Sequence, residues 1–455
     1  MGENMFLEKD GILKRFAKYA SLNVLGMLGL SCYILADTFF VSMGLGANGL
    51  AALNLAIPVY SFLHGSGLML GMGGGTQFAI QKSQNKREAA NRIFTHTIRL
   101  AAIFAAVFVL LGLFLTETLV HLLGADEAVF AMTKTYMQVI LLFAPAFLLN
   151  NVLLCFVRND GAPQLAMAAM IGGSLSNVIL DYVFIFPLGM GIFGAVLATG
   201  LAPIFSMLIL SPHFLKKKNT FHLVKCRMEG RESLGIISSG IPSLITEVSS
   251  GIVMIVFNSI LLRLQGNIGV AAYGVIANLS LVVLALFTGI AQGIQPILSS
   301  SFGAGREREM QSILRYALLS MLVLSGLLYM GVFFGASQIA AIFNSAGDKM
   351  LQHLAVEGLR IYFLACPFAG YNIILSVYFT STGIPRPAHI ISILRGFAVI
   401  LPMALLLSSL AGIAGVWSAF PVTELLVAGM GVVFYGVYRK KKGKGGGTEQ
   451  KQGNE

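Results

Sequence analysis

Four acidic side chains lie deep inside long apolar stretches of the sequence, where ionised groups are rare. Asp37, Asp181, Glu247 and Glu424 each have many apolar residues on both sides, and no Lys or Arg is expected at a comparable depth. An ionised side chain at the centre of a bilayer costs at least ~2.5–3.5 kcal/mol. Acidic residues at such positions are therefore expected to bind a cation or a proton, or to line a polar cavity.

The depth of these acids divides them into two pairs. At 1.5 Å per residue, Asp37 lies ~30 Å and Asp181 ~27 Å from the start of its helix, towards the far side of the bilayer. Asn177 precedes Asp181 by one helical turn and so lies on the same helix face. Glu247 and Glu424 lie ~16–18 Å into their helices, near the midplane. We expect Asp37 and Asp181 to share a proton or bind Na⁺ in one dry pocket.

The second pair is expected to face a cavity for cargo in the second half of the chain. Glu247 is expected to contact cationic cargo or to transmit protonation, and Glu424 to support it through a shared hydrogen bond or proton. Neutral buried acids that satisfy one another are the structural alternative. His64 lies in another apolar stretch, where a hydrogen-bonded core histidine and a proton relay are both open interpretations.

Patterns typical of enzymes and of nucleotide-driven pumps are absent from the sequence. It contains no Walker A lysine motif, no HExxH and no GxSxG. Residues 189–194 match GxGxxG in form only, because no strand precedes them. The four cysteines (Cys32, Cys155, Cys226 and Cys366) are scattered and predict neither a disulfide nor a metal site. We therefore expect no enzyme and no cofactor.

The composition is that of a membrane protein. Hydrophobic residues make up 56% of the 455 residues, charged residues only 11%, and the mean hydropathy is +0.80. Soluble domains contain roughly 45–50% apolar and about 25% charged residues. The net charge of +11 comes from short clusters between apolar stretches, which indicates membrane topology and not nucleic-acid binding.

Charge clusters and Gly, Pro and Asn turns divide the chain into twelve stretches long enough to cross a hydrocarbon core of ~30 Å. When the spans alternate, all of the 31 Lys and Arg residues fall on one side except Lys134, Arg263, Lys349 and Arg360. This asymmetry predicts a membrane protein with both termini in the cytoplasm; the resemblance described below implies the inner membrane of a bacterium. The predicted spans are residues 17–43, 51–80, 93–116, 132–156, 163–186, 191–215, 236–262, 270–299, 312–343, 352–380, 387–410 and 412–437.

The two halves of the chain repeat one another at a separation of about 220 residues. Residues 50–52, 86–88, 161–163 and 191–194 match residues 270–272, 306–308, 383–385 and 412–415, in the same order. Six spans per half is an even number, so the halves share one orientation, as in transporters whose two lobes rock to alternate access.

The predicted fold is an all-α polytopic membrane protein with twelve transmembrane helices. They form two six-helix bundles related by a pseudo-twofold axis along the membrane normal. The predicted parts are an N-lobe (1–215), a cytoplasmic linker (216–235), a C-lobe (236–438) and a disordered basic tail (439–455).

An ordered set of motifs resembles the MATE (multidrug and toxic compound extrusion) family, and within it the bacterial DinF/MepA-like branch. The resemblance covers roughly residues 15–435. It implies two bundles around a V-shaped central cavity and cation-coupled export of amphipathic, often cationic drugs. The motifs are residues 36–42 (ADTFFVS), 49–52 (GLAA) with Pro58, 158–163 (RNDGAP), 177–181 (NVILD), 194–199 (GAVLAT) and 415–417 (GVW).

The resemblance also implies a cation site in the N-lobe. In this branch the site is formed by a helix 1 Asp, a helix 4 Tyr, a helix 5 Asn and Asp, and a helix 6 Thr. The coupling ion is H⁺ or Na⁺, and a helix 7 glutamate seen in several branches matches Glu247. No helix 10 Asp accompanies it, a departure from the NorM-like pattern that puts a C-lobe Na⁺ site in doubt. The matching N-lobe residues are Asp37, Tyr136, Asn177, Asp181 and Thr199, of which all but Tyr136 are candidate Na⁺ ligands.

The expected partners are the lipid bilayer and small-molecule drugs, with no nucleic acid, and the expected state is a monomer. Two other functions remain open. A lipid-linked oligosaccharide flippase of the same superfamily would favour cationic cavity residues facing pyrophosphate, and almost none are expected. A membrane-embedded prenyl transferase would need an aspartate-rich motif for Mg²⁺-pyrophosphate, which the sequence lacks.

Overall fold

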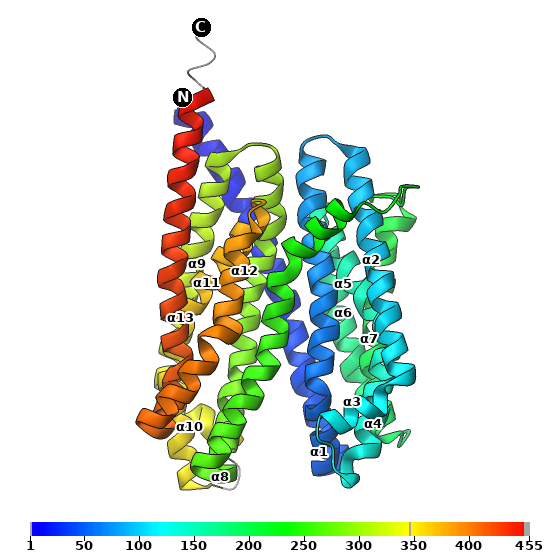
Figure 1. Ribbon diagram of the computed structural model, residues 1–455, viewed down its shortest axis with the longest axis vertical. Coiled ribbons are helices and arrows are strands. Elements are labelled where there is room, and N and C mark those ends of the chain that lie inside the picture. The colour runs from blue at the N-terminus through cyan, green and yellow to red at the C-terminus, as the bar shows by residue number, and fades with distance from the viewer. Residues whose placement is uncertain (1, 345–346, 450–455) are drawn as a thin grey trace.

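The computed structural model describes the backbone of residues 2–344 and 347–449 and the side chains of residues 11–344 and 347–440. Every regular element in these ranges is helical, as predicted (Figure 1). The first half contains α1 (Gly2–Ser83), α2 (Arg87–Phe114), α3 (Thr116–Leu122), α4 (Glu127–Leu142), α5 (Ala144–Asn159), α6 (Pro163–Ile185) and α7 (Gly191–Leu215). The second half contains α8 (Gly230–Gly303), α9 (Glu307–Phe343), α10 (Lys349–Tyr362), η1 (Phe363–Ala365), α11 (Cys366–Ser381), α12 (Pro385–Ile393), η2 (Leu394–Ala398) and α13 (Ile400–Glu449).

Three of the long helices contain a sharp break and therefore supply more than one span. Gly46 in α1, Gly266 in α8 and Gly412 in α13 have φ values of 66°, 62° and 58°, which glycine adopts without steric cost. Helices α4 and α5 form one span bent by 49°. With these breaks, the long apolar helices of the described residues supply the twelve predicted spans.

Glycines with left-handed backbone occur at corresponding turns of the two halves. Three such pairs lie at turns between spans, and the two members of each pair are about 220 residues apart. The same turn therefore occurs at the same place in both halves, in agreement with the predicted repeat. The pairs are Gly46 and Gly266, Gly161 and Gly383, and Gly191 and Gly412.

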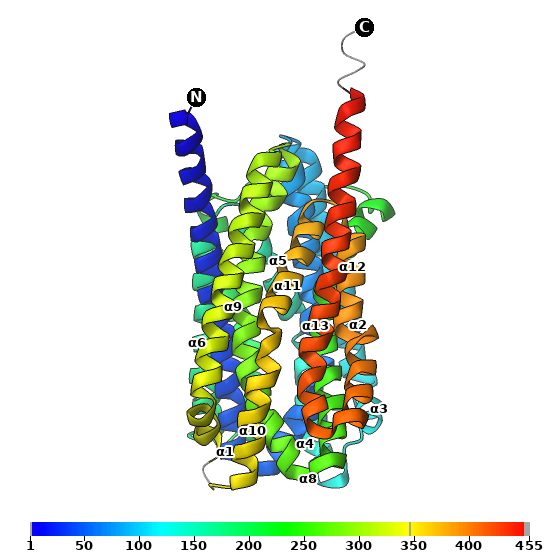
Figure 2. The same ribbon diagram turned by 90° about the vertical axis from the view of Figure 1, so that its left-hand side faces the viewer.

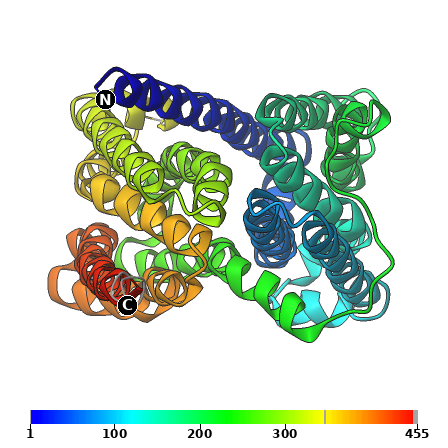
Figure 3. The same cartoon turned by 90° about the horizontal axis from the view of Figure 1, so that it is seen from above.

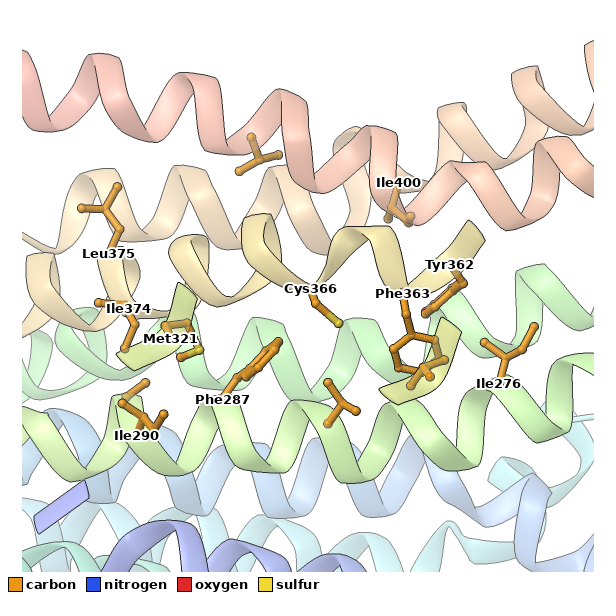
Figure 4. Packing of buried hydrophobic residues seen from close by; sticks show 14 of the residues in the cluster. Ile276, Phe287, Ile290, Met321, Tyr362, Phe363, Cys366, Ile374, Leu375 and Ile400 are labelled. Atoms are coloured by element: carbon orange, nitrogen blue, oxygen red, sulfur yellow. The ribbon is translucent and has the colours of Figure 1, made fainter. Parts of the chain in front are cut away.

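Each lobe is built around its own cluster of buried apolar side chains. The C-lobe cluster includes Phe287, Met321 and Phe363, which come from α8, α9 and η1 (Figure 4). The N-lobe cluster includes Phe78 and Phe156, whose ring centroids are 5.2 Å apart. Two separate cores allow each bundle to move as one body.

The start of α1 packs on the C-lobe although the rest of this helix belongs to the N-lobe. Phe16 and Ala20 are members of the C-lobe cluster, and the ring of Phe16 lies 6.0 Å from that of Tyr316. Helix α1 therefore runs from beside the C-lobe across to the N-lobe (Figure 3). It ties the two lobes together at the end of the molecule that holds both termini, which we call the terminal face (Figure 2).

The lobes contact each other closely near the terminal face. Gln77 Nε2 donates to Ser239 Oγ at 3.1 Å, and Gln295 Nε2 donates to Thr76 Oγ1 at 2.9 Å. Asn159 Nδ2 donates to Gln295 Oε1 at 3.0 Å. These residues lie within about three turns of the terminal-face ends of α1, α5 and α8. Neutral polar pairs therefore join the lobes there, together with the ion pair between Arg92 of α2 and Glu232 of α8.

Two glycines permit this close approach. A Cβ at Gly73 would lie 1.9 Å from the carbonyl oxygen of Ile236, and a Cβ at Gly240 would lie 1.8 Å from that of Met69. Any larger side chain would collide with the backbone of the facing helix. The second half of α1 and the first half of α8 therefore touch backbone to backbone.

The linker between the lobes is docked on the N-lobe and is not a free loop. Phe221 is buried, and its ring lies 4.6 Å from that of Phe94 and 5.5 Å from that of Phe156. The backbone NH groups of His222 and Val224 donate to side chains of α2. Apolar burial of one ring together with backbone hydrogen bonds fixes the segment.

A buried carboxylate holds the start of the linker. Asp160 accepts hydrogen bonds from Lys82 at 2.5 Å, from the backbone NH of Thr220 at 2.9 Å, and from the Thr220 hydroxyl, and it lies 2.9 Å from His213 Nε2. Burial raises the pKa of Asp160, but the hydrogen bonds from Lys82 and Thr220 outweigh it, so the pKa lies below its usual value. Asp160 is therefore ionised at neutral pH and keeps its partners.

The C-terminal end differs from the prediction of a disordered tail from residue 439 onwards. Helix α13 continues to Glu449. Residues 450–455 lie outside the described part of the chain.

The docked linker leads to a first prediction. Phe221→Ala removes the buried ring, and Phe-to-Ala changes in a core cost about 3–5 kcal/mol. Local opening of the linker should therefore increase on the order of 100-fold, and trypsin should cleave at Lys225 correspondingly faster in inverted vesicles.

Leu223→Ala is the matched control, because Leu223 is 66% exposed in the same segment; its cleavage rate should match that of the parent chain. Cleavage of the linker in intact cells, from outside, would contradict the predicted cytoplasmic location of both termini.

Candidate functional site

A cavity of about 400 Å³ lies between the two lobes. It is lined from the N-lobe by α1, α5, α6 and α7, and from the C-lobe by α8, α10 to α13 and η2. Its volume is within the range of small-molecule sites, roughly 300–1,000 Å³. Three features lie in or beside it: a carboxyl cluster in the N-lobe, a contact between the lobes, and an ion pair in the C-lobe.

The five residues predicted for a cation site come together inside the N-lobe. Asp37 lies in the first half of α1, Tyr136 in α4, Asn177 and Asp181 in α6, and Thr199 in α7. All five side chains are buried. Four helices therefore converge on one polar cluster that apolar residues surround.

Two contacts organise the carboxyl cluster. Asn177 Nδ2 donates to Asp181 Oδ2 at 3.0 Å and its Oδ1 accepts from the Thr199 backbone NH at 3.2 Å, the amide orientation that satisfies both groups. The carboxyl groups of Asp37 and Asp181 are neighbours in this cluster. A hydrogen bond between two carboxyl groups requires that one of them carries a proton.

The same cluster contains polar atoms that the protein leaves unsatisfied. The Oδ1 atoms of Asp37 and Asp181 are buried and make no hydrogen bond in the structure. Buried carboxyl oxygens without a partner are rare in folded proteins. Together with the Asn177 and Thr199 oxygens, they form an oxygen-only donor set, which suits Na⁺ or a proton.

Polar side chains line the cavity beside this cluster, beginning with Tyr33, one helical turn before Asp37 on α1. The hydroxyl groups of Tyr33 and Tyr60 are 3.0 Å apart, and both residues line the cavity. The ring of Tyr60 stacks on that of His64 at 5.7 Å. Thr199 of the cluster also lines the cavity, so the cluster and the cavity share a wall.

His64 and Glu247 meet where the lobes face each other at mid-membrane. His64 Nδ1 lies 3.6 Å from Glu247 Oε2. His64 belongs to the N-lobe and Glu247 to the C-lobe, and the Glu247 side chain is 36% exposed to the cavity. The prediction that both residues line the cavity agrees with this geometry.

Glu424 does not support Glu247, and the expectation that it lacks a basic partner is wrong. The Arg395 guanidinium contacts Glu424 Oε1 at 2.8 Å through Nη2 and at 2.9 Å through Nε. Asn372 Nδ2 donates to Glu424 Oε2 at 2.7 Å. Glu424 is therefore the buried half of a bidentate ion pair that lines the C-lobe side of the cavity.

The backbone near Arg395 explains why the sequence did not reveal this pair. Arg395 stands ten residues after Pro385, the first residue of α12, and the charge asymmetry of the sequence places it among the cytoplasmic basic residues. The π-helical turn η2 contains Arg395. A π-turn widens the helix locally and changes the direction of the side chains within it.

The sequence also led us to expect almost no cationic cavity residues, and this expectation is wrong. Arg158 and Arg395 both line the cavity. Arg158 is 3% exposed and lies at the end of α5, where its position next to a loop suggested a surface residue. A weak signal was available, because Arg158 begins residues 158–163, one of the motifs that carry the family resemblance.

Comparison with known proteins identifies the family. The sequence model of the MatE family matches residues 23–183 and again residues 242–406, one match in each lobe. The chain belongs to the MatE family. It is therefore a multi-pass membrane transporter and not an enzyme, as the sequence predicts.

The relatives of this MatE protein agree along nearly the whole chain. It is 26% identical to "Multidrug export protein MepA" of Staphylococcus saprophyticus and 24% identical to that of Staphylococcus aureus, each over 425 residues and 93% of both chains. An outward-facing MATE family transporter of the MOP superfamily matches with a TM-score of 0.88 and 24% identity, over 95% of this chain and 96% of that one.

A MOP superfamily transporter from Pyrococcus furiosus, described as having reverse polarity of its binding pocket, matches with a TM-score of 0.86 and 24% identity. The match covers 92% of this chain and 94% of that one. These structures support the fold of this MatE protein.

The ion pair in the C-lobe leads to a second prediction. Arg395→Met leaves Glu424 buried without its cation, and removal of one partner of a buried pair costs about 3–5 kcal/mol. Addition of Glu424→Gln should recover most of this loss, because no uncompensated charge remains. Thermal unfolding of the purified protein in detergent measures both effects.

Arg360→Met serves as the control, since Arg360 is exposed and contacts Phe333 through the carbonyl oxygen and the ring; its effect should stay within about 1 kcal/mol. Additive losses in the double variant would show that the two side chains do not act as a pair.

Proposed function

We propose that this MatE protein is a cation-coupled multidrug exporter that works as an antiporter by alternating access. The central support is the shared wall between the carboxyl cluster and the cavity, where Thr199 belongs to both. The names of the MepA relatives supply the cargo class, small drugs. The cavity volume of about 400 Å³ suits molecules of that size.

Coupling requires that the ion and the drug prefer different states of the transporter. A ligand that binds two states equally shifts no equilibrium. Na⁺ or H⁺ at Asp37 and Asp181 changes the charge of the cluster, and the polar side chains of Tyr33 and Tyr60 carry that change to the cavity wall. The ion then weakens the hold on the drug and favours the return of the lobes.

Both H⁺ and Na⁺ could satisfy the unpaired oxygens of Asp37 and Asp181. A shared proton suits the two neighbouring carboxyl groups of Asp37 and Asp181. Na⁺ suits the oxygen set that Asn177 and Thr199 extend. Asp37 and Asp181 lie on the side of the bilayer away from the terminal face, so with cytoplasmic termini the ion enters from outside.

The contacts between the lobes at the terminal face determine to which side of the membrane the cavity opens. With both termini in the cytoplasm, the contacts at Gln77, Asn159 and Gln295 close the cytoplasmic side, and the cavity serves the outward-facing state. Drug release and ion entry take place in this state, and drug uptake takes place after the contacts part.

The carboxyl cluster leads to a third prediction. Asp37→Asn and Asp181→Asn keep side-chain size but remove the titratable charge, so each should reduce coupled export at least about tenfold without loss of expression. Dye efflux from an efflux-deficient host measures export, and vesicles with only a Na⁺ or only a H⁺ gradient separate the two ions. Near-normal efflux in both variants would exclude the cluster from coupling.

The contact between the lobes leads to a fourth prediction. Glu247→Gln removes the negative charge of the cavity wall beside His64, so export of cationic drugs should fall several-fold more than export of neutral drugs. Transport of a cationic dye and of a neutral drug of similar size measures the difference. Ser250→Ala provides a control, because it changes another cavity-lining residue one turn away without a change in charge.

Equal loss for cationic and neutral drugs would assign Glu247 a structural or coupling role. Unchanged export of both would show that Glu247 has no role in transport beyond its contact with His64.

A further inference from the structure

Arg158 is a cation at the terminal-face end of the cavity whose partners are all neutral. Its Nη1 donates to Asn23 Oδ1 at 2.6 Å and to Gln292 Oε1 at 3.3 Å. Its Nη2 contacts Met72 Sδ at 3.3 Å and Cys155 Sγ at 3.5 Å, and sulfur is a weak acceptor. Its Nε is buried and has no hydrogen-bond partner among the residues that the structure describes.

The neighbouring carboxylate does not balance this charge. Asp160, two residues away, is engaged by Lys82, His213 and Thr220. Among the described side chains, no carboxylate forms an ion pair with Arg158, whereas Arg395 in the same cavity is paired with Glu424. A buried guanidinium without an anion is costly, and the fold keeps one here.

The cavity reaches this guanidinium and carries the opposite charge elsewhere. Arg158, Cys155 and Gln292 line its terminal-face end, and Glu247 lines it at mid-membrane. With Arg395 and Glu424 neutralising each other, one uncompensated cation and one acid remain on the cavity wall. Such a wall is complementary to a molecule that carries both an anionic and a cationic group.

We propose that Arg158 is the anion subsite of the cavity and binds a carboxylate of zwitterionic cargo whose cationic group faces Glu247. This inference rests on the proposed drug-export function. The guanidinium can bind a carboxylate by donating two parallel hydrogen bonds to it. The weak contact to Gln292 and the contacts to the two sulfur atoms must first break. The anion then satisfies the buried charge that the protein leaves open.

The test compares two dyes that differ only at one carboxyl group. Tetramethylrhodamine is a zwitterion, and its methyl ester is a cation of nearly the same size and shape. Fluorescence polarisation with the purified full-length protein measures both affinities. Arg158→Gln should weaken binding of the free acid about tenfold, the effect of losing a hydrogen bond to a charged group, and change binding of the ester less than about twofold.

A second variant keeps the arginine and fills its site. Gln292→Glu places a carboxylate where the amide oxygen now lies 3.3 Å from Arg158 Nη1, so it should compete with the acid dye and weaken its binding by a similar factor while sparing the ester. It also tests the idea if Arg158→Gln fails to fold.

A different role for Arg158 makes different predictions. Asn23 and Arg158 are in the N-lobe and Gln292 is in the C-lobe, so the group also bridges the lobes. If Arg158 were only a latch, Arg158→Gln and Gln292→Glu would shift the closure of the lobes in opposite directions, and each would affect acid and ester alike. That pattern overturns the anion subsite and leaves drug export intact, whereas failure of both dyes to bind the parent protein would overturn both proposals.

Discussion

The structure of this MatE protein depends on how charge is handled inside a low-dielectric bilayer. Every ionised group placed there loses hydration worth several kcal/mol unless a partner replaces it. Glu424 has that partner in Arg395 and Asn372, and Asp160 has it at the membrane edge. These two sites are satisfied within the fold and serve its architecture.

The sites that are not satisfied lie where ligands are expected. Asp37 and Asp181 each keep one buried oxygen without a partner, and Arg158 keeps its Nε without one. The protein therefore leaves negative charge unbalanced in the N-lobe cluster and positive charge unbalanced at the end of the cavity. A cation bound at the Asp37 and Asp181 cluster and a cargo carboxylate bound at Arg158 would balance these charges. The free energy of binding could then favour one state of the transporter over the other.

The same reasoning applies to the interface between the lobes. Its contacts near the terminal face include glycine backbone contacts and neutral side-chain pairs, such as Gln295 with Thr76, beside an ion pair between Arg92 of α2 and Glu232 of α8. Neutral pairs and backbone contacts can separate at a smaller cost in free energy than buried ion pairs. Two independent hydrophobic cores, one in each lobe, keep each bundle intact while such an interface opens.

The docked linker and the start of α1 limit that movement. Phe221 fixes the linker to the N-lobe, and Phe16 fixes the start of α1 to the C-lobe. Both connections cross between lobes at the terminal face, so they hold the bundles together at the end where the cavity is closed.

The sequence by itself determined the class, the spans, the repeat and three of the five residues in the N-lobe cluster (Asp37, Asn177 and Asp181). These follow from local signals: the length of apolar stretches, clusters of basic residues, glycines at turns such as Gly46, and acids such as Asp37 whose burial in lipid is costly. The length of an apolar stretch and the free-energy cost of burying a charge depend on local sequence, so both can be predicted without knowledge of the tertiary structure. The resemblance to a family then added Tyr136 and Thr199, which no local signal marks.

Only the tertiary structure decided which charges meet. The charge asymmetry of the sequence places Arg395 among the cytoplasmic basic residues. In the structure it lies in a π-turn and pairs with Glu424 on another helix. Arg158 was assigned to a loop, yet it lies buried at the end of the cavity beside Gln292 of the other lobe. Pairing depends on helix rotation, tilt and the contact between distant segments, and these are set by packing of the whole bundle and leave no periodic trace in the sequence.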